Sequence, residues 1–427
     1  MTATMVPAST GIGAPGTQAA PASLSRSPMA SQPQAAAAAA IPFTRGSSLA
    51  TMQDATLTAV AAGTPSQVQL QTNAFLENII VDVNMVTADN SAAVTYVADG
   101  PWNIISNVTL ADPAGQAIIA PITGYGLYLL NKYLPDTSCA FDPKQDPNYV
   151  ATTSTGATGG SFSFRLIIPV EHRRRDAFGA LNNSAANQRY LLTFNWVGAF
   201  TSIYGTAPTN AGTLGVQIYQ QYWTSPPASI VTSSGQTAVQ ATPTGLGTVG
   251  FVRYEEHAEV AGGGSPQIQL NNVGDYISSL IFVLRDTAGA RDINVGTQGA
   301  ATANWASPFA WWVNDFQVQS LTAYGPGGVG TAGGFWGRWM ARAYGYKTAA
   351  NEAAGGLDNG VYILPFLNDL FDSAKENFGP ANQYLATDAT TKLQIRGSTW
   401  GSGAAKLQVF TRLLRPVSGA ALFSGGF

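Results

Sequence analysis

Charge is scarce in this sequence, and the scarcity excludes several classes of protein. Only 11% of the 427 residues are Asp, Glu, Lys or Arg, against roughly 25% in ordinary soluble proteins. Long charged helices and coiled coils are excluded, because they depend on such residues. The 46 glycines and 24 prolines, together with many neutral polar residues, are instead typical of strands, turns and an uncharged surface that suits burial in an assembly.

Basic clusters, cysteines and long apolar runs are also missing. No Lys or Arg lies between Arg45 and Lys132, and the net charge is −3, so we expect no direct binding to nucleic acid, which needs a basic patch. Cys139 is the single cysteine, which excludes an intrachain disulfide. No apolar run approaches the ~18 residues of a membrane span. The N-terminus lacks the basic start and apolar block of a signal peptide, so we expect synthesis in the cytoplasm.

The first part of the chain differs in composition from the rest. Residues 1–52 are mainly Ala, Ser, Thr, Pro, Gly and Gln, with Arg26 and Arg45 as the only charged residues. Such a segment cannot bury enough apolar surface to fold alone. We expect an N-terminal arm that is either disordered or ordered only on assembly.

From residue 64 onward, apolar residues alternate with polar ones. The alternation, with turn residues between the runs, predicts half-buried antiparallel strands. It is clearest in residues 67–71, 78–85, 161–166 and 190–196. Short helices are expected in the loops at 125–134, within 176–187, at 335–344 and at 367–377. The predicted fold class is all-β.

The chain contains an internal repeat. Three segments of the first half return in the same order: 67–71 as 267–271, 75–81 as 276–282, and 166–170 as 362–366. An Ala-Asn-Gln triplet follows the third segment each time, at 186–188 and 381–383. Four matches in one order indicate two similar domains in tandem. We place the domains at 53–225 and 249–427, joined by a linker at 226–248.

Each domain has room for about eight strands, the number in a jelly roll. A β-sandwich with an extra sheet is the competing architecture. The long connections, such as residues 110–161, favour the jelly roll. We therefore expect two tandem eight-stranded jelly rolls with short helices in the loops, preceded by the extended arm.

A series of short segments in the first domain carries a family resemblance. The segments are Gly-Pro-Trp-Asn-Ile-Ile at 100–105, Asp-Pro at 112–113, the run 123–131, and the strands at 164–170 and 188–194. Their order resembles that in double jelly-roll major capsid proteins of the tectivirus/adenovirus-like lineage, the type found in tailless icosahedral phages. The resemblance covers residues 65–225 and reaches the second domain through the repeat.

The resemblance implies a major capsid protein that acts by self-assembly. Two jelly rolls standing side by side supply two sixths of a hexagon, so a homotrimer forms a pseudo-hexameric capsomer, and capsomers tile an icosahedral viral shell. The arm is implied to lie beneath the capsomer. Its implied partners are neighbouring capsomers, minor capsid proteins such as penton or cement proteins, and an internal lipid membrane. The implied location is the capsid of a virion made in the host cytoplasm.

One dense charge cluster follows the predicted strand that ends at Pro169. We predict that it makes intersubunit contacts, because charge is rare elsewhere and arginine binds carboxylates in a bidentate way. The alternative is a solvated loop whose charges pair internally. The candidate contact residues are Glu171, Arg173, Arg174, Arg175 and Asp176.

Catalysis and metal binding find little support. His172 and His257 are the only histidines, and neither lies in a recognisable catalytic motif. Glu255, Glu256 and Glu259 flank His257, but their spacing fits no calcium loop or zinc site, so we expect a solvated strand edge there. The prediction is a protein that is not an enzyme and uses no cofactor or metal.

Tryptophans in the second domain leave one alternative function open, because jelly rolls that bind carbohydrate stack sugars on aromatic rings. Against it, Trp311 and Trp312 are expected to straddle a strand, with one ring in the core. Trp336 and Trp339 lie at helical spacing, which predicts an apolar face packed on the sheet or against a neighbouring subunit. Packing is the favoured interpretation, and a carbohydrate-binding β-sandwich is the alternative.

Overall fold

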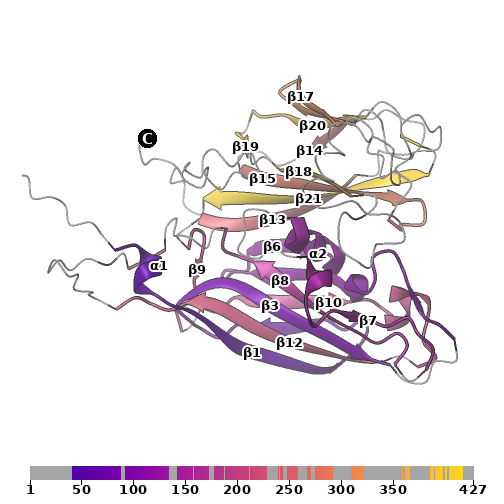
Figure 1. The fold of residues 1–427 in the computed structure, drawn as a ribbon. Helices are drawn as coiled ribbons and strands as arrows, with labels where there is room; N and C mark the ends of the chain where they lie inside the picture. Colours follow the sequence, from indigo (N-terminus) through magenta and orange to yellow (C-terminus); the bar gives the residue numbers. More distant parts are fainter. Residues whose placement is uncertain are drawn as a thin grey trace, which may run out of the picture. The chain divides into compact units, whose positions relative to one another are not determined.

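Strands dominate the computed structural model of the chain (Figure 1). All the described residues belong to one compact unit, 40–427. The structure describes residues 41–87, 92–133, 142–156, 158–172, 177–186, 188–210, 212–227, 239, 241–243, 248–257, 267–270, 275–291, 309–321, 358, 361–365, 385–388, 390–397, 400–401 and 403–416. No helix in these ranges is long and apolar enough to cross a membrane.

The first half of the chain forms two sheets around a shared apolar core. Its main strands are β1 (Leu49–Val60), β2 (Ser66–Gln69), β3 (Phe75–Val86), β5 (Ile105–Ala111), β6 (Ala117–Ile122), β8 (Phe162–Pro169), β10 (Leu191–Trp196) and β12 (Thr213–Trp223). The short elements are α1 (Phe43–Gly46), β4 (Thr95–Tyr96), η1 (Trp102–Ile104), α2 (Gly124–Tyr133), η2 (Pro143–Gln145), β7 (Val150–Ala151), β9 (Leu181–Asn182), η4 (Phe200–Ile203) and β11 (Tyr204–Thr206).

The second half contains a matching set of strands, drawn from pink through orange to yellow in Figure 1. They are β13 (Thr248–His257), β14 (Gln267–Leu270), β15 (Tyr276–Asp286), β16 (Phe309–Val313), β17 (Phe316–Leu321), β18 (Val361–Pro365), β19 (Leu385–Ala386), β20 (Leu393–Gly397) and β21 (Ala404–Pro416).

Strand order identifies the architecture of both halves. The first half has the orders β1-β12-β3-β8 and β2-β10-β5-β6, and the second half has β13-β21-β15-β18 and β14-β20-β16-β17. Without the two-residue β19, each half has eight main strands. In one sheet of each half the strand order is first, eighth, third, sixth. In the other sheet it is second, seventh, fourth, fifth. This is the order of an eight-stranded jelly roll. The predicted fold class of two tandem jelly rolls is confirmed.

The sequence repeat falls on equivalent strand pairs. Asn78 lies opposite Pro169 in the pair β3–β8, and Ser279 lies opposite Pro365 in the pair β15–β18. Immediately before Asn78 and before Ser279, the register against the last strand shifts, which is a β-bulge at the same place in both jelly rolls. The repeated apolar segments are therefore the central strands of the two sandwiches.

Two of the expected helices fall wholly or mainly on described residues, with different outcomes. The helix predicted at 125–134 is confirmed as α2. The helix predicted within 176–187 is wrong over 177–186, where the chain forms turns and β9. Ala177 and Gly179 have φ of 53° and 85°, which a right-handed helix excludes, and Leu181 pairs with Leu76 of β3. The helices predicted at 335–344 and 367–377 lie outside the described residues.

The strands also bear on the predicted domain limits. β1 begins at Leu49, opposite Trp223 at the end of β12, so the last residues assigned to the arm are part of the first sheet. β13 begins at Thr248, next to the predicted start of the second domain. The division into 1–52, 53–225, 226–248 and 249–427 stays a prediction.

The sheet β1-β12-β3-β8 of the first jelly roll and the sheet β13-β21-β15-β18 of the second differ in how their outer faces are covered. In β12, buried residues alternate with less buried ones from Leu214 to Gln220, as expected for a sheet that is covered on one face. In the equivalent strand β21, every residue from 407 to 414 is buried, and so is every residue of β15 from 277 to 285. The sheet of the second jelly roll is therefore covered on both faces.

Candidate functional site: the junction between the jelly rolls

The two jelly rolls meet along a continuous sheet. β6 lies parallel to β13, with Ile119 opposite Val252. This contact joins β2-β10-β5-β6 of the first jelly roll to β13-β21-β15-β18 of the second. Because the pairing covers an edge of each sheet, it satisfies backbone groups that an open edge would expose.

Helix α2 packs on the sheet of the second jelly roll. Thr123 caps its first turn, since Thr123 Oγ1 accepts a hydrogen bond from the backbone N–H of Gly126 at 3.0 Å. All ten residues of α2 are buried. Gly126 lies so close to the ring of Phe410 in β21 that any Cβ at this position would clash with the ring. The contact accounts for part of the cover on the outer face of β21.

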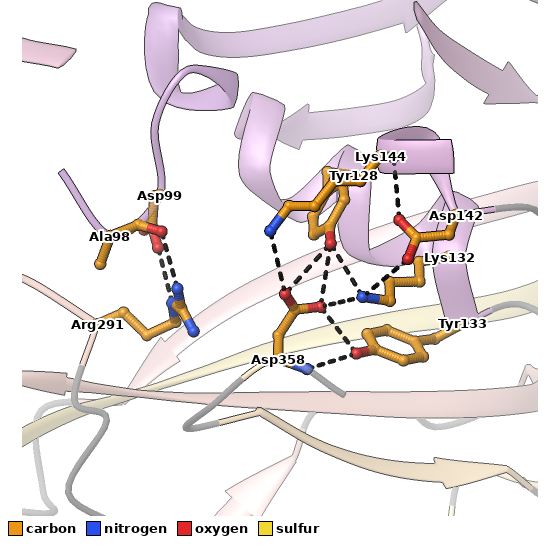
Figure 2. A network of polar contacts seen from close by, with 9 residues as sticks. All are labelled: Ala98, Asp99, Tyr128, Lys132, Tyr133, Asp142, Lys144, Arg291 and Asp358. Carbon is orange, nitrogen blue, oxygen red and sulfur yellow. Dashed lines mark hydrogen bonds and ion pairs between the residues drawn. The ribbon is translucent and has the colours of Figure 1, made fainter. Parts of the chain in front are cut away.

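A buried ionic network connects α2 with Asp358, which precedes β18 (Figure 2). The carboxylate of Asp358 accepts hydrogen bonds from Lys132 Nζ at 2.9 Å, from the Tyr133 hydroxyl at 2.8 Å and from the Tyr128 hydroxyl at 3.2 Å. The Tyr133 hydroxyl in turn accepts from the backbone N–H of Asp358 at 2.8 Å. A buried carboxylate is tolerated only when it is paired and hydrogen-bonded in this way.

The charges within this network balance. Lys132 Nζ lies 3.3 Å from Asp142 Oδ2 as well as 2.9 Å from Asp358, and Lys144 Nζ lies 3.9 Å from the second oxygen of Asp358. Burial, and next the charge of Asp358, raises the pKa of the Tyr128 hydroxyl well above its usual value. The same causes raise the pKa of the Tyr133 hydroxyl. Both hydroxyls therefore stay protonated and able to donate.

A second ionic contact crosses the junction at Asp99. Its carboxylate pairs with Arg285 of β15 and with Arg291, whose Nε lies 3.0 Å from Asp99 Oδ1. Arg291 also donates to the carbonyl of Ala98 at 2.8 Å (Figure 2). Both guanidinium groups lie near the ring of Tyr125, at 5.8 and 5.2 Å from its centroid, a favourable cation–π geometry.

These contacts fix the geometry of the junction. Hydrogen-bonded ion pairs specify one geometry, because any other arrangement would leave a buried charge unpaired. Among the described residues there is no group of three or more His, Cys, Asp or Glu side chains that could hold a metal ion. The junction therefore holds the two jelly rolls in one relative position.

Comparison with known proteins supports this description of the fold. The sequence matches no family model and no curated protein. Among solved structures, the STIV MCP covers 86% of this chain and 97% of its own at 13% identity, with a TM-score of 0.53. A chain of the PBCV-1 virus capsid covers 88% of this chain and 97% of its own at 12% identity, also with a TM-score of 0.53. The chain has a double jelly-roll fold. At these identities the likeness concerns the fold alone, and the sequence resemblance is confirmed at that level.

The charge cluster predicted from the sequence of this double jelly roll is partly described. Glu171 is 1% exposed, and its Oε2 accepts a hydrogen bond from Trp223 Nε1 at 2.6 Å. Its backbone N–H donates to the carbonyl of Glu77 at 2.8 Å. Glu171 thus lies in the interior of its own chain. The other four candidates, Arg173, Arg174, Arg175 and Asp176, lie outside the described residues, and the intersubunit role of the cluster stays a prediction.

The acidic group around His257 lies on a strand, as expected. Glu255, Glu256 and His257 pair with β21, opposite Val409, Gln408 and Leu407. In the sheet, β13 lies between β21 and β6. The pairing of β13 with β6 is at Val252, three residues before Glu255, so the solvated edge stays a prediction. Glu259 lies outside the described residues.

The tryptophan pair follows its predicted arrangement. Trp311 is 1% exposed and faces the core, while Trp312 is half-buried on the other face of β16. The guanidinium of Arg396 lies 4.1 Å from the centroid of the Trp312 ring. That ring face is therefore occupied, which leaves the carbohydrate-binding alternative without support at this pair. Trp305, Trp336 and Trp339 lie outside the described residues.

Sequence reasoning missed the residues of the junction. Lys132 is the first basic residue after Arg45, and it ends a predicted apolar helix. In a chain with so little charge, a lone charge at the end of an apolar segment signals a buried ion pair. The sequence could not name the partner, since Asp358 lies 226 residues away.

Proposed function

We propose that this chain is the major capsid protein of an icosahedral virus and that it acts by self-assembly. The observation that carries the proposal is the double jelly roll with its fixed junction, a fold that the chain shares with the STIV MCP and with a chain of the PBCV-1 virus capsid. Two similar domains held at one angle present similar surfaces in two directions, which suits a closed ring of repeated contacts.

In this proposal three copies form a homotrimer with a pseudo-hexameric outline. Each copy supplies two of the six jelly rolls, and the trimers tile the facets of the shell. The outer face of the first jelly roll supports the proposal by its chemistry. Its β12 positions are Gly215, Gln217, Tyr219 and Gln221, all uncharged, so lateral contact there leaves no unpaired charge buried.

The arm is proposed to act beneath the capsomer. Phe43, near the end of the predicted arm, is 2% exposed and packs edge-to-face on Phe75 and Trp223, with centroids 5.2 and 6.2 Å away. This contact fixes the end of the arm to the first jelly roll. The proposed partners of the arm are neighbouring capsomers, minor capsid proteins such as penton or cement proteins, and an internal lipid membrane.

Further parts of the proposal follow from the same role. The protein is not an enzyme, it is made in the host cytoplasm, and it resides in the virion. The segment from Glu171 to Asp176 is proposed to contact a neighbouring subunit through its arginines. Within that segment the buried Glu171 fixes the start of the loop through its hydrogen bond with Trp223.

Electron microscopy of the purified protein tests the proposal. We expect class averages with a hexagonal outline and six lobes, because each trimer contains six jelly rolls. Two-lobed particles of a single chain at high protein concentration would contradict it. Binding of the protein to a carbohydrate array, with no higher assembly, would favour the carbohydrate-binding alternative.

A further inference from the structure

β1 and β17 are the longest of the described strands that end a sheet, and they have little of the usual protection of an exposed edge. β1 pairs with β12 alone, and β17 pairs with β16 alone. Soluble proteins normally place lysine, proline or inward charge on such edges. β1 contains one charged residue, Asp54, which accepts a hydrogen bond from the backbone N–H of Gln71 at 2.8 Å. β17 contains no charged residue.

These two strands are the counterparts of the strands that form the internal junction. β1 and β13 are the first strands of their jelly rolls, and β17 and β6 are the fifth. Inside the chain, the fifth strand of the first jelly roll pairs in parallel with the first strand of the second. The fifth strand of the second jelly roll and the first strand of the first jelly roll have no such partner among the described strands.

The strand registers identify the equivalent of Val252 on β1. Val252 lies opposite Arg412, which lies opposite Ser279. Thr51 lies opposite Gln221, which lies opposite Asn78. Ser279 and Asn78 occupy the same position, directly after the β-bulge. Thr51 is therefore the equivalent of Val252.

The equivalent of Ile119 on β17 follows in the same way. Ile119 lies opposite Leu110, and Gln319 lies opposite Trp311. Leu110 and Trp311 are equivalent, because strand pairing across one neighbouring strand relates them to Val68 and Ile268, which match in the sequence repeat of 67–71 and 267–271. The two chains of pairs are Leu110–Leu192–Val68 and Trp311–Ile395–Ile268.

The cover of the outer faces shows the same asymmetry. Phe410 lies opposite Ile281, and its equivalent Tyr219 lies opposite Ile80. Phe410 is fully buried under α2, whereas Tyr219 is half-buried and its hydroxyl donates to Gln217 at 2.7 Å. The face that α2 covers in the second jelly roll is thus uncovered by described residues in the first.

A groove of about 630 Å³ lies on this uncovered face, and β1, β3, β8 and β12 line it. Its charges are already paired, since Arg165 Nε lies 2.6 Å from Asp82 Oδ1. The remaining lining side chains include the neutral Thr56, Asn84 and Gln217. A groove of this kind can be buried by a second protein surface without leaving a charge unpaired.

We infer that β17 of one copy docks in parallel along β1 of the next copy, with Gln319 opposite Thr51. The neighbouring copy would then cover Tyr219, as the first jelly roll covers Phe410 within the chain. The inference rests on the proposed trimer and names its contact surface. The contact is heterologous, and three such contacts close a ring of six jelly rolls.

Cysteine cross-linking tests the strand pairing. The background variant is Cys139→Ser, and Thr51→Cys is combined in it with Gln319→Cys. Paired strand positions bring two Cα atoms within the ~4.4–6.8 Å that a disulfide needs, so we expect covalent dimers and trimers on non-reducing gels. Ile119→Cys with Val252→Cys is the intrachain control, which should cross-link within one chain. Gln67→Cys on exposed β2, combined with Gln319→Cys, is the mismatched control and should stay uncross-linked.

The outcomes separate this inference from the proposed function. If the native mass is that of a trimer but the pair at 51 and 319 links no better than the mismatched pair, the docking surface is overturned and the trimer stands. If no trimer forms, both the docking surface and the proposed homotrimer are overturned. The inference is supported if the pair at 51 and 319 cross-links between chains and the mismatched pair at 67 and 319 does not.

A charge at Tyr219 provides a second measurement that does not depend on disulfide geometry. Tyr219→Glu lies on the outer face of β12, so the single chain should fold, which circular dichroism checks. We expect trimer association to weaken by at least about tenfold, because the neighbour would bury an unpaired carboxylate. Gln67→Glu, on an exposed strand away from the proposed surface, should leave association unchanged. Equal trimer stability in both variants overturns the inference.

Discussion

At the scale of single residues, the rarity of charge gives each buried charge a defined task. Lys132 and Asp358 connect the two jelly rolls at 2.9 Å, and both side chains are almost fully buried. Asp99 does the same with Arg285 and Arg291. Such pairs contribute little net stability relative to apolar packing, but breaking one partner is costly. Their main effect is to fix the geometry of the junction.

Asp358→Asn tests this claim, because it removes the charge and keeps the volume. The ammonium of Lys132 loses its closest counter-charge in a buried site. We expect the free energy of unfolding to fall by about 3 kcal/mol, measured by urea denaturation. The matched control is Asp315→Asn, whose carboxylate is 61% exposed and pairs with Arg396. The control should change stability by less than about 0.5 kcal/mol, and an equal loss in both variants would contradict the account.

Buried tyrosines predict a loss of stability in alkali. Burial raises the pKa of Tyr190 to about 12 and that of Tyr149 to about 12, whereas an unfolded chain titrates near 10. The contribution is complete below pH ~10 and is lost as the pH rises toward 12, because the unfolded state releases its protons first. Each tyrosine then lowers stability by at most ~1.4 kcal/mol per pH unit. Urea denaturation between pH 9 and ~11.5 should show a shallower decline for Tyr190→Phe, and an identical slope would be evidence against this cause.

At the scale of elements, α2 is the piece that converts two sandwiches into one unit. The helix itself was predicted from the sequence at residues 125–134. The strand on which α2 packs could not be predicted, because its contact with β21 joins residues far apart in the chain. Gly126 carries the contact, and a glycine inside a helix usually has such a packing reason.

Gly126→Ala tests the contact between α2 and β21. Alanine favours helix by up to ~1 kcal/mol over glycine, but the new Cβ would clash with the ring of Phe410. We expect overpacking to outweigh propensity, with a net loss of about 1–3 kcal/mol in the free energy of unfolding. Gly198→Ala is the control, since no atom lies within 4 Å of a Cβ there. A stabilised Gly126→Ala variant would show that α2 does not pack as described.

The strands show where sequence reasoning succeeds and where it ends. Alternating runs and the repeat predicted the central strands β3 and β15, because side-chain period and order are local properties. Which strands they pair with was not predicted. The helix expected within 176–187 failed, because the positive φ of Ala177 and Gly179 depends on the fold and not on spacing. The sequence pointed to the charge-rich loop at 171–176 and not to the junction, whose residues are brought together only by the tertiary structure.

At the scale of the whole molecule, we propose that the internal junction is the template for assembly. The edges of β6 and β13 pair with each other, whereas the equivalent edges of β17 and β1 have no partner among the described strands. Besides the strand pairing, α2 and two ionic contacts join the two jelly rolls. The surface beside β1 is uncharged or internally paired. Repeating one contact around a ring accounts for both the similarity of the two halves and the scarcity of charge.

The native mass of the purified protein tests the central claim most directly. Light scattering after size exclusion should give a single species at three times the chain mass of 44.5 kDa, because the ring closes after three copies. A species that remains at 44.5 kDa at high protein concentration would contradict a capsomer built from this chain.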